Sequence, residues 1–215
     1  MTQEHSTARG PRPAGRPRDL ERHRAVLTST RAILVADGYP GVTFAEVARS
    51  AGVTRQLVYR WWPTKAALVS EAMFAAEATT WPSTFPGPLD HDVRTWVDAM
   101  VTHAARPDVR AGVRGLLAEI GTSDTLPGLS KHLITPIRHS LDALLTAAQA
   151  RGEVHPDIDP VLTTETVTGA ITMHLLLDRA EPPVITAHLT QLLTWAFGSR
   201  AAQQELPRPS AQGHP

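Results

Sequence analysis

The chain has 215 residues, of which 42% are hydrophobic and 20% are charged, so it can bury one or two modest cores and is neither wholly disordered nor fibrous. It contains no cysteine, which excludes disulfides, thiolate zinc sites, iron–sulfur clusters and cysteine nucleophiles. No stretch approaches the roughly 18 apolar residues of a membrane span, and the N-terminus lacks the apolar segment of a secretory signal. We therefore expect a cytoplasmic protein with no membrane partner.

The net charge of zero hides an asymmetry along the chain. Residues 1–65 hold 11 Lys and Arg against 5 Asp and Glu, whereas residues 66–215 hold 10 against 16. The first part therefore carries +6 and the remainder −6. A basic N-terminal part on an acidic body indicates a polyanionic partner at one end of the molecule, and nucleic acid is the commonest such partner.

The elements expected in chain order are almost all helical. Residues 1–18 alternate Pro, Gly and Arg with little to bury, so they are predicted to be a disordered basic arm, and residues 199–215 a flexible tail. Helical spacing and breakers between segments predict helices over residues 19–37, 43–51, 54–61, 64–79, 89–105, 109–121, 127–151, 159–179 and 184–198. Strand signals are nearly absent, and the predicted fold class is all-α. Pro136 lies inside the seventh helix and predicts a kink or a split there.

The most informative stretch runs from Thr43 to Trp62. Thr43 and Glu46 are predicted to form a capping box, in which the hydroxyl accepts from the third helical amide and the carboxylate returns to the cap amide. Small Ala48 lets two helices approach, Gly52 permits a left-handed turn, and Val58 fills the angle between the helices. This spacing predicts a helix-turn-helix.

The second helix of this motif presents a polar face. Thr54 caps the helix, and Arg55, Gln56, Tyr59 and Arg60 point outward. This set suits DNA, because Arg can read guanine, Gln can read adenine and Tyr can donate to phosphate. The alternative is a small packing unit with a solvated face, and the charge of +6 favours DNA.

These residues resemble the TetR family of bacterial transcription regulators. The resemblance is carried by the first helix and by short matches at Gly38-Tyr39, Thr43, Ala48, Gly52-Val53, Val58-Tyr59-Arg60 and the run Trp62-Pro63-Thr64-Lys65-Ala66-Ala67-Leu68. It implies a three-helix DNA-binding domain over residues 19–65 and a helical ligand-binding and dimerisation domain over residues 66–198. Trp61 departs from the family, where a polar residue, Tyr or His is more usual, and Ala66 replaces the usual Glu.

The resemblance also implies roles for single residues. The positions of Thr43, Tyr59 and Lys65 usually touch phosphates, and those of Thr54, Arg55, Gln56 and Arg60 approach base edges. Trp61 either contacts the sugar-phosphate backbone or shields the first helix. Arg16 lies in a Gly-Arg-Pro-Arg sequence that resembles the centre of an AT-hook, so Arg16 and Arg18 are candidate minor-groove contacts, the alternative being a solubilising arm.

The last two predicted helices each carry an apolar face. One face comprises Leu162, Thr166, Gly169, Ala170, Met173 and Leu177, and the other comprises Leu189, Leu192, Leu193, Ala196 and Phe197. Small residues at the centre permit close approach, so the faces are predicted to form an intermolecular four-helix bundle. An internal core is the alternative. A homodimer also suits a helix-turn-helix that reads two half-sites of a palindromic double-stranded operator.

A pocket for a small-molecule effector is expected among the middle helices. The candidate ligand-binding residues are Phe74, Trp96, Met100, His103, Leu117, Ile120, Ile137 and His174. The alternative for each is a core position, which is the commoner role of such an apolar stripe. The expectation of a lipophilic effector comes from the family resemblance, and nothing in the sequence identifies the compound.

Enzyme motifs are missing from the sequence. It has no nucleophile elbow, no His-Glu-x-x-His and no phosphate-binding Gly loop, and its ten His lack ligand spacing, so we expect no catalytic residue, metal or cofactor. The expected function is a transcriptional repressor released by a small hydrophobic ligand. The alternatives are an activator, a ligand-independent DNA-binding regulator, or a module that sequesters a small molecule.

Overall fold

The computed structural model describes residues 16–75, 80–119, 126–155 and 157–198. Over these ranges the chain forms nine helices, with a single isolated β-bridge between Val154 and Gly198, which confirms the all-α class. The helices are α1 (Arg16–Gly41), α2 (Phe44–Ala51), α3 (Arg55–Trp61), α4 (Lys65–Phe74), α5 (Leu89–Ala105), α6 (Pro107–Glu119), α7 (Leu126–Ala150), α8 (Pro160–Leu176) and α9 (Pro182–Phe197).

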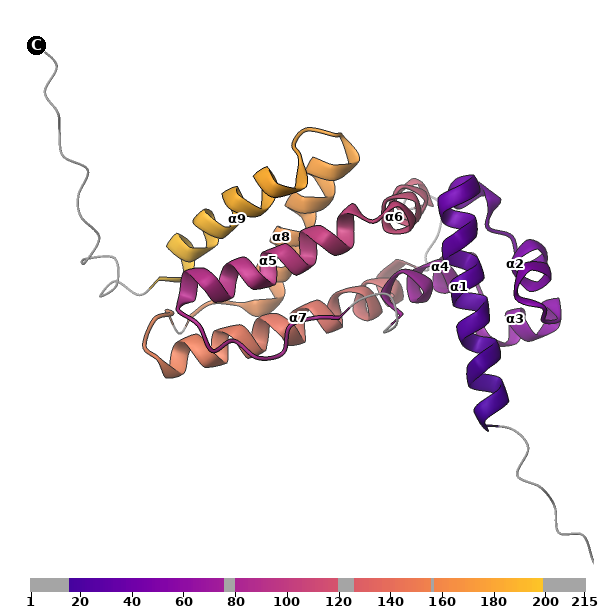
Figure 1. The fold of residues 1–215 in the computed structure, drawn as a ribbon, viewed down its shortest axis with the longest axis horizontal. Helices are drawn as coiled ribbons and strands as arrows, with labels where there is room; N and C mark the ends of the chain where they lie inside the picture. Colours follow the sequence, from indigo (N-terminus) through magenta and orange to yellow (C-terminus); the bar gives the residue numbers. More distant parts are fainter. Residues whose placement is uncertain (1–15, 76–79, 120–125, 156, 199–215) are drawn as a thin grey trace, which may run out of the picture.

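The molecule is elongated, with a head at one end and a body at the other (Figure 1). In the head, α2 and α3 lie on the outer side of α1, and α4 leads from the head toward the body. Helices α5, α7, α8 and α9 form the body, and α6 lies between the body and α1. No helix in the described ranges has both the length and the apolar character needed to cross a bilayer.

Several helix limits differ from the predicted ranges: α4 ends at Phe74 and α8 at Leu176, both earlier than predicted, and α6 and α9 begin two residues early, at Pro107 and Pro182. Further differences concern α1 and α7. Helix α1 begins at Arg16, so residues 16–18 are helical and not part of a disordered arm; residues 1–15 and 199–215 lie outside the described residues. The predicted end of α1 at Gly38 appears as a break, because Gly38 has φ 68° and ψ −172°, after which a helical turn resumes to Gly41. Helix α7 runs unbroken past Pro136, so the predicted split is wrong.

Two cores divide the chain differently from the predicted boundary at residue 65. The head core combines buried residues of α1 to α4 with Val109 and Leu116 of α6. The body core is built on Trp96 and takes its other residues from α5, α7, α8, α9 and the segments beside them. Helix α4 and one face of α6 therefore pack with the head.

Two glycines let α6 approach the head closely. A Cβ atom at Gly115 would overlap the Tyr39 ring of α1, and one at Gly112 would overlap the Met73 sulfur of α4. Any larger residue at Gly115 would push α6 away from α1.

The other side of α6 is tied to the end of α8. Arg110 donates to the Leu175 carbonyl at 2.8 Å and to the Asp178 carboxylate at 2.5 Å. Arg114 donates to the Leu176 carbonyl at 3.4 Å. Asp178 has φ 48°, a left-handed conformation that is uncommon for a residue other than glycine. Helix α6 thus contacts both the head core and the turn between α8 and α9.

Candidate DNA-binding surface and effector pocket

Helix α2 begins with half of the predicted capping box. The Thr43 hydroxyl accepts from the Glu46 amide at 3.1 Å, as the sequence predicts. The Glu46 carboxylate does not return to the Thr43 amide, however; it accepts from Arg49 Nε at 3.0 Å, and this hydrogen bond lowers the pKa of Glu46. An exposed carboxylate one turn from a guanidinium gains a charge-assisted bond in this way.

The turn between α2 and α3 follows the predicted design. Gly52 has φ 64° and ψ 33°, a left-handed conformation that favours glycine. The Val53 amide donates to the Ala48 carbonyl at 3.0 Å, and the Thr54 hydroxyl accepts from the Leu57 amide at 3.3 Å. Val58 is fully buried between the helices. These local contacts fix the direction of α3.

The outward face of α3 carries Arg55, Gln56, Tyr59 and Arg60, all exposed. The Tyr59 ring meets Phe44 of α2 edge to face, with ring centroids 4.3 Å apart. Its hydroxyl accepts from Arg55 at 2.9 Å, and the guanidinium carbon lies 5.2 Å from the ring centroid. Two of the four polar side chains are therefore held against each other before any partner binds.

The other candidate DNA contacts lie beside this face. Thr43 and Thr54 are exposed helix caps. Trp61 is half-buried, with its ring edge-on to His23 of α1 at 5.3 Å, which is the shielding position of the two predicted. The Lys65 ammonium lies 4.0 Å from the Tyr39 ring centroid, and burial lowers its pKa. The side chains of Arg16 and Arg18 lie outside the described part of the structure.

A capped helix-turn-helix, a polar recognition helix and an all-α body together define a DNA-binding transcription regulator. Residues 26–72 match the family described as "Bacterial regulatory proteins, tetR family", and residues 86–194 match "Tetracyclin repressor-like, C-terminal domain". The second match alone spans half of the chain. The chain belongs to the TetR family of transcriptional regulators.

Named relatives and a solved structure agree with this membership. The "Uncharacterized HTH-type transcriptional regulator YdeS" of Bacillus subtilis (strain 168) is 28% identical over 190 residues, which cover 85% of this chain and 91% of the relative. The "DNA-binding transcriptional repressor TetR" of Mycobacteroides abscessus is 28% identical over 158 residues, which cover 73% of this chain and 83% of the relative. The crystal structure of a TetR transcriptional regulator from Agrobacterium tumefaciens has a TM-score of 0.62 at 17% identity, covers 86% of this chain and 98% of that chain, and so supports the fold.

A small apolar pocket lies between the end of α4 and the body. Its volume is about 60 Å³, and it is lined by Phe74, Trp81, Met100, His103, Ala104, Val109, Val113, Ile137, Thr168, Ile171 and Thr172. The His103 ring is packed against Phe74 and Trp81, with centroids 4.6 and 5.2 Å away. Burial, with a smaller contribution from Arg106, lowers the pKa of His103 to about 4. The imidazole is therefore uncharged at neutral pH.

The structure places the predicted pocket residues in different surroundings. Phe74, Met100, His103 and Ile137 line this pocket. Trp96 is fully buried in the body core, and Leu117 is exposed on α6, so its prediction as a pocket residue is wrong. His174 is half-buried on α8 and is absent from the pocket lining. Ile120 lies outside the described residues.

Trp81 is the main pocket residue that the sequence did not reveal. It precedes α5 in a Pro-rich segment, where no helical periodicity indicates which side chains turn inward. The available signal was a bulky aromatic residue directly before Pro82, in a segment otherwise read as a loop.

The predicted dimer faces are partly correct in exposure. On α8 and its C-cap residue Leu177, the side chains of Leu162, Met173 and Leu177 are more than half exposed. Thr166 and Gly169 are exposed, and Ala170 is half-buried. On α9, Leu192 and Ala196 are exposed, whereas Leu189, Leu193 and Phe197 are buried in the chain's own core, so these three are wrong as partner contacts. The exposed apolar side chains of α9 are instead Val184, Leu192 and Trp195, the last 68% exposed.

Proposed function

We propose that the protein is a repressor that binds a palindromic operator as a homodimer, and that a small apolar effector releases it. The observation that carries the proposal is the exposed face of α3, where Arg55, Gln56, Tyr59 and Arg60 lie together. The direction of this helix is fixed by its own N-cap, Thr54, and by the capped helix α2 before it. The name of the Mycobacteroides abscessus relative, a DNA-binding transcriptional repressor, supports the sign of the regulation.

The candidates on and beside α3 have two kinds of role within this proposal. Thr54, Arg55, Gln56 and Arg60 reach base edges in the major groove, and Thr43, Tyr59 and Lys65 contact phosphates. The bond from Arg55 to Tyr59 restricts the guanidinium before binding, which reduces the entropy lost when it meets a base. Lys65 must exchange the Tyr39 ring for a phosphate, a stronger electrostatic partner.

The dimer proposal is supported by apolar residues that the single chain leaves in water. The six exposed residues concerned are Leu162, Met173, Leu177, Val184, Leu192 and Trp195. A concentration of large apolar side chains on two neighbouring helices indicates a protein interface. A two-fold axis through this surface pairs α8 and α9 with the same helices of a second copy, as a symmetric dimer requires.

The size of the effector pocket suggests how release occurs. A drug-sized ligand needs roughly 300 Å³ or more, whereas this pocket has about 60 Å³. An effector must therefore displace side chains, and Phe74 at the end of α4 and the adjacent Trp81 are the aromatic residues in its way. Because α4 begins at Lys65 beside the DNA-reading unit, a shift of Phe74 tilts the head and changes the separation of the two α3 helices.

The proposal is tested by selecting fragments of genomic DNA that the purified protein binds, followed by transcription from those fragments in vitro. A repressor binds a palindrome and lowers transcription from the adjacent promoter. Increased transcription would identify an activator. Failure to enrich any sequence would favour a module that only sequesters a small molecule.

Release by an effector has a thermodynamic signature. A ligand that weakens operator binding through α4 must itself bind more weakly to the operator complex, by the same factor, which typically corresponds to about 1–3 kcal/mol. Titrating the effector with and without operator DNA measures this factor. Equal affinities would support the ligand-independent alternative.

A further inference from the structure

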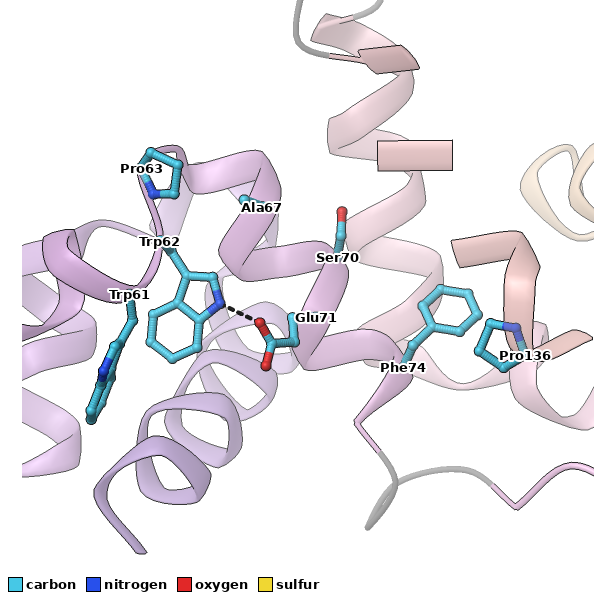
Figure 2. Close-up of a pocket in the computed structure, with 8 residues that line it drawn as sticks. All are labelled: Trp61, Trp62, Pro63, Ala67, Ser70, Glu71, Phe74 and Pro136. Carbon is cyan, nitrogen blue, oxygen red and sulfur yellow. Dashed lines mark hydrogen bonds between the residues drawn. The ribbon is translucent and has the colours of Figure 1, made fainter. Parts of the chain in front are cut away.

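A second and larger cavity opens on the surface where the head meets the body. Its volume is about 350 Å³, within the range of ligand sites. Figure 2 shows Trp61, Trp62 and Pro63 on one side, Phe74 and Pro136 on the other, and α4 crossing between them with Ala67, Ser70 and Glu71. We call it the interdomain cleft. Its walls are formed by the end of α3 and the two residues after it, by one side of α4, and by Pro136 of α7.

The side chains of the interdomain cleft combine aromatic walls with one carboxylate. Trp61 and Phe74 are half-buried, so each keeps some ring surface exposed, and Trp62 is buried with its indole directed at Glu71. Among the described residues that line the cleft, Glu71 is the one with a formal charge, and none is Lys or Arg. Aromatic faces and a carboxylate both attract cations.

Two neighbours hold the Glu71 carboxylate in position. One oxygen accepts from Trp62 Nε1 at 2.7 Å, and the other lies 3.1 Å from His23 Nε2. The Glu71 side chain nevertheless remains 47% exposed. A carboxylate offers about four lone-pair directions, so both oxygens can still accept from a ligand. The group is thus oriented, accessible and next to exposed ring surface.

We propose that the interdomain cleft binds an organic cation that carries aromatic rings. Its charge pairs with Glu71, and its rings contact Trp61 and Phe74. This site is distinct from the apolar pocket of about 60 Å³ behind Phe74, where no carboxylate is found among the described lining residues. Binding itself requires nothing of the proposed repressor function.

The effect of such a ligand on DNA binding does rest on the proposed function. A ligand in the cleft touches the last residue of the recognition helix α3 and, across α4, Pro136 of α7. It therefore fixes the angle between head and body, and with it the spacing of the two recognition helices in a dimer.

The test is calorimetric titration of the full-length protein, without DNA, with tetraphenylphosphonium, and with neutral triphenylphosphine oxide as the uncharged comparison. Glu71→Gln keeps the shape and an oxygen for Trp62, and should weaken the cation about tenfold while changing the neutral compound little. Asp98→Asn on α5 removes an exposed charge elsewhere and should leave both affinities unchanged. Thermal melting of each variant confirms that it is folded.

A second pair of variants separates the two cavities. Ala67→Leu narrows the interdomain cleft and should weaken binding of the cation. Ala104→Leu narrows the apolar pocket of about 60 Å³ and should leave cation binding unchanged. Equal cation affinity in wild type and Glu71→Gln would overturn the proposal, and so would loss of binding in Ala104→Leu alone. If the cation binds as expected but no operator is found, the site stands and the repressor proposal fails.

Discussion

The two exposed faces of this protein differ in chemistry and in what holds them. The outward face of α3 is short and polar, and its Tyr59 is packed on Phe44 and bonded to Arg55. The exposed face of α8 and α9 is long and apolar, and it holds Met173, Leu192 and Trp195 in water. Part of the polar face is held in place within one chain, because Arg55 and Tyr59 are bonded to each other. The apolar face has no such internal partners for its large exposed side chains, and we propose that a second copy covers it.

This difference separates two kinds of binding. A polar face on a rigid helix chooses among partners through the placement of donors and acceptors. An apolar face gains free energy from area removed from water, with little regard to direction. We therefore expect changes in α3 to alter which sequence is bound, and changes in α8 or α9 to alter whether the protein assembles at all.

The largest effect is expected from Gly169→Arg, which places a charge on the exposed apolar face of α8 and α9. A Cβ at Gly169 meets nothing within 4 Å in the single chain, so the monomer should fold normally. A charge placed where two copies meet should break the dimer and weaken binding to a full operator about 100-fold or more, because the second half-site no longer contributes. Light scattering and operator titration measure the two effects.

Gln149→Arg, at an exposed position of α7, is the matched control for the added charge, and this variant should remain dimeric. A Gly169→Arg protein that stays dimeric would place the interface elsewhere.

The next largest effect concerns the close packing of α6 against the head that carries the polar face. Gly115→Ala places a methyl group in the Tyr39 ring, next to the backbone of α1, and should cost about 3 kcal/mol of unfolding free energy. Gly112→Ala meets the flexible Met73 thioether and should cost less, since that side chain can move. Urea unfolding compares the two. Equal stabilities would mean that α6 does not require its glycine against α1.

Substitutions on α3 sharpen the comparison from the polar side. Arg55→Ala and Gln56→Ala should each cost about 1–3 kcal/mol against the preferred base and relax sequence choice. Lys65→Ala should weaken all sequences alike. Binding to a randomised operator library distinguishes these outcomes, and unchanged specificity in both the Arg55 and Gln56 variants would remove them from base reading.

The smallest effect concerns His103, which is buried in the apolar pocket between the end of α4 and the body. Its pKa is lowered to about 4 in the folded protein, against about 6.5 in an unfolded chain. The unfolded state therefore binds more protons between these values, and stability is lost as the pH falls from 7 toward 4. The loss reaches about 2 kcal/mol at pH 5. His103→Leu should abolish this part of the pH dependence in urea unfolding; an unchanged slope would assign it to other groups.

The sequence predicted most helices and the whole helix-turn-helix because their signals are local. Thr43, Gly52 and Thr54 each act on backbone groups within a few residues, so their conformations follow from spacing alone. The choice of Glu46 between an amide and Arg49 was not predictable in this way, since both partners are near in the chain and similar in strength.

The faces of α9 required the three-dimensional fold. This helix has apolar residues on two sides, Leu189, Leu193 and Phe197 on one and Val184, Leu192 and Trp195 on the other. Periodicity identifies both sides as apolar but cannot tell the chain's own core from a partner's surface. The inward turn of Trp81 likewise depends on distant helices.

The position of α6 bears on how such regulators can be recombined. Val109 and Leu116 complete the head core, and Gly115 fits the Tyr39 ring of α1, although α6 lies more than thirty residues beyond α4 in sequence. A chimera that joins residues 16–75 to a foreign body would leave this core open on one side. A functional graft must carry α6 as well, or receive from the new host a helix with glycine opposite Tyr39.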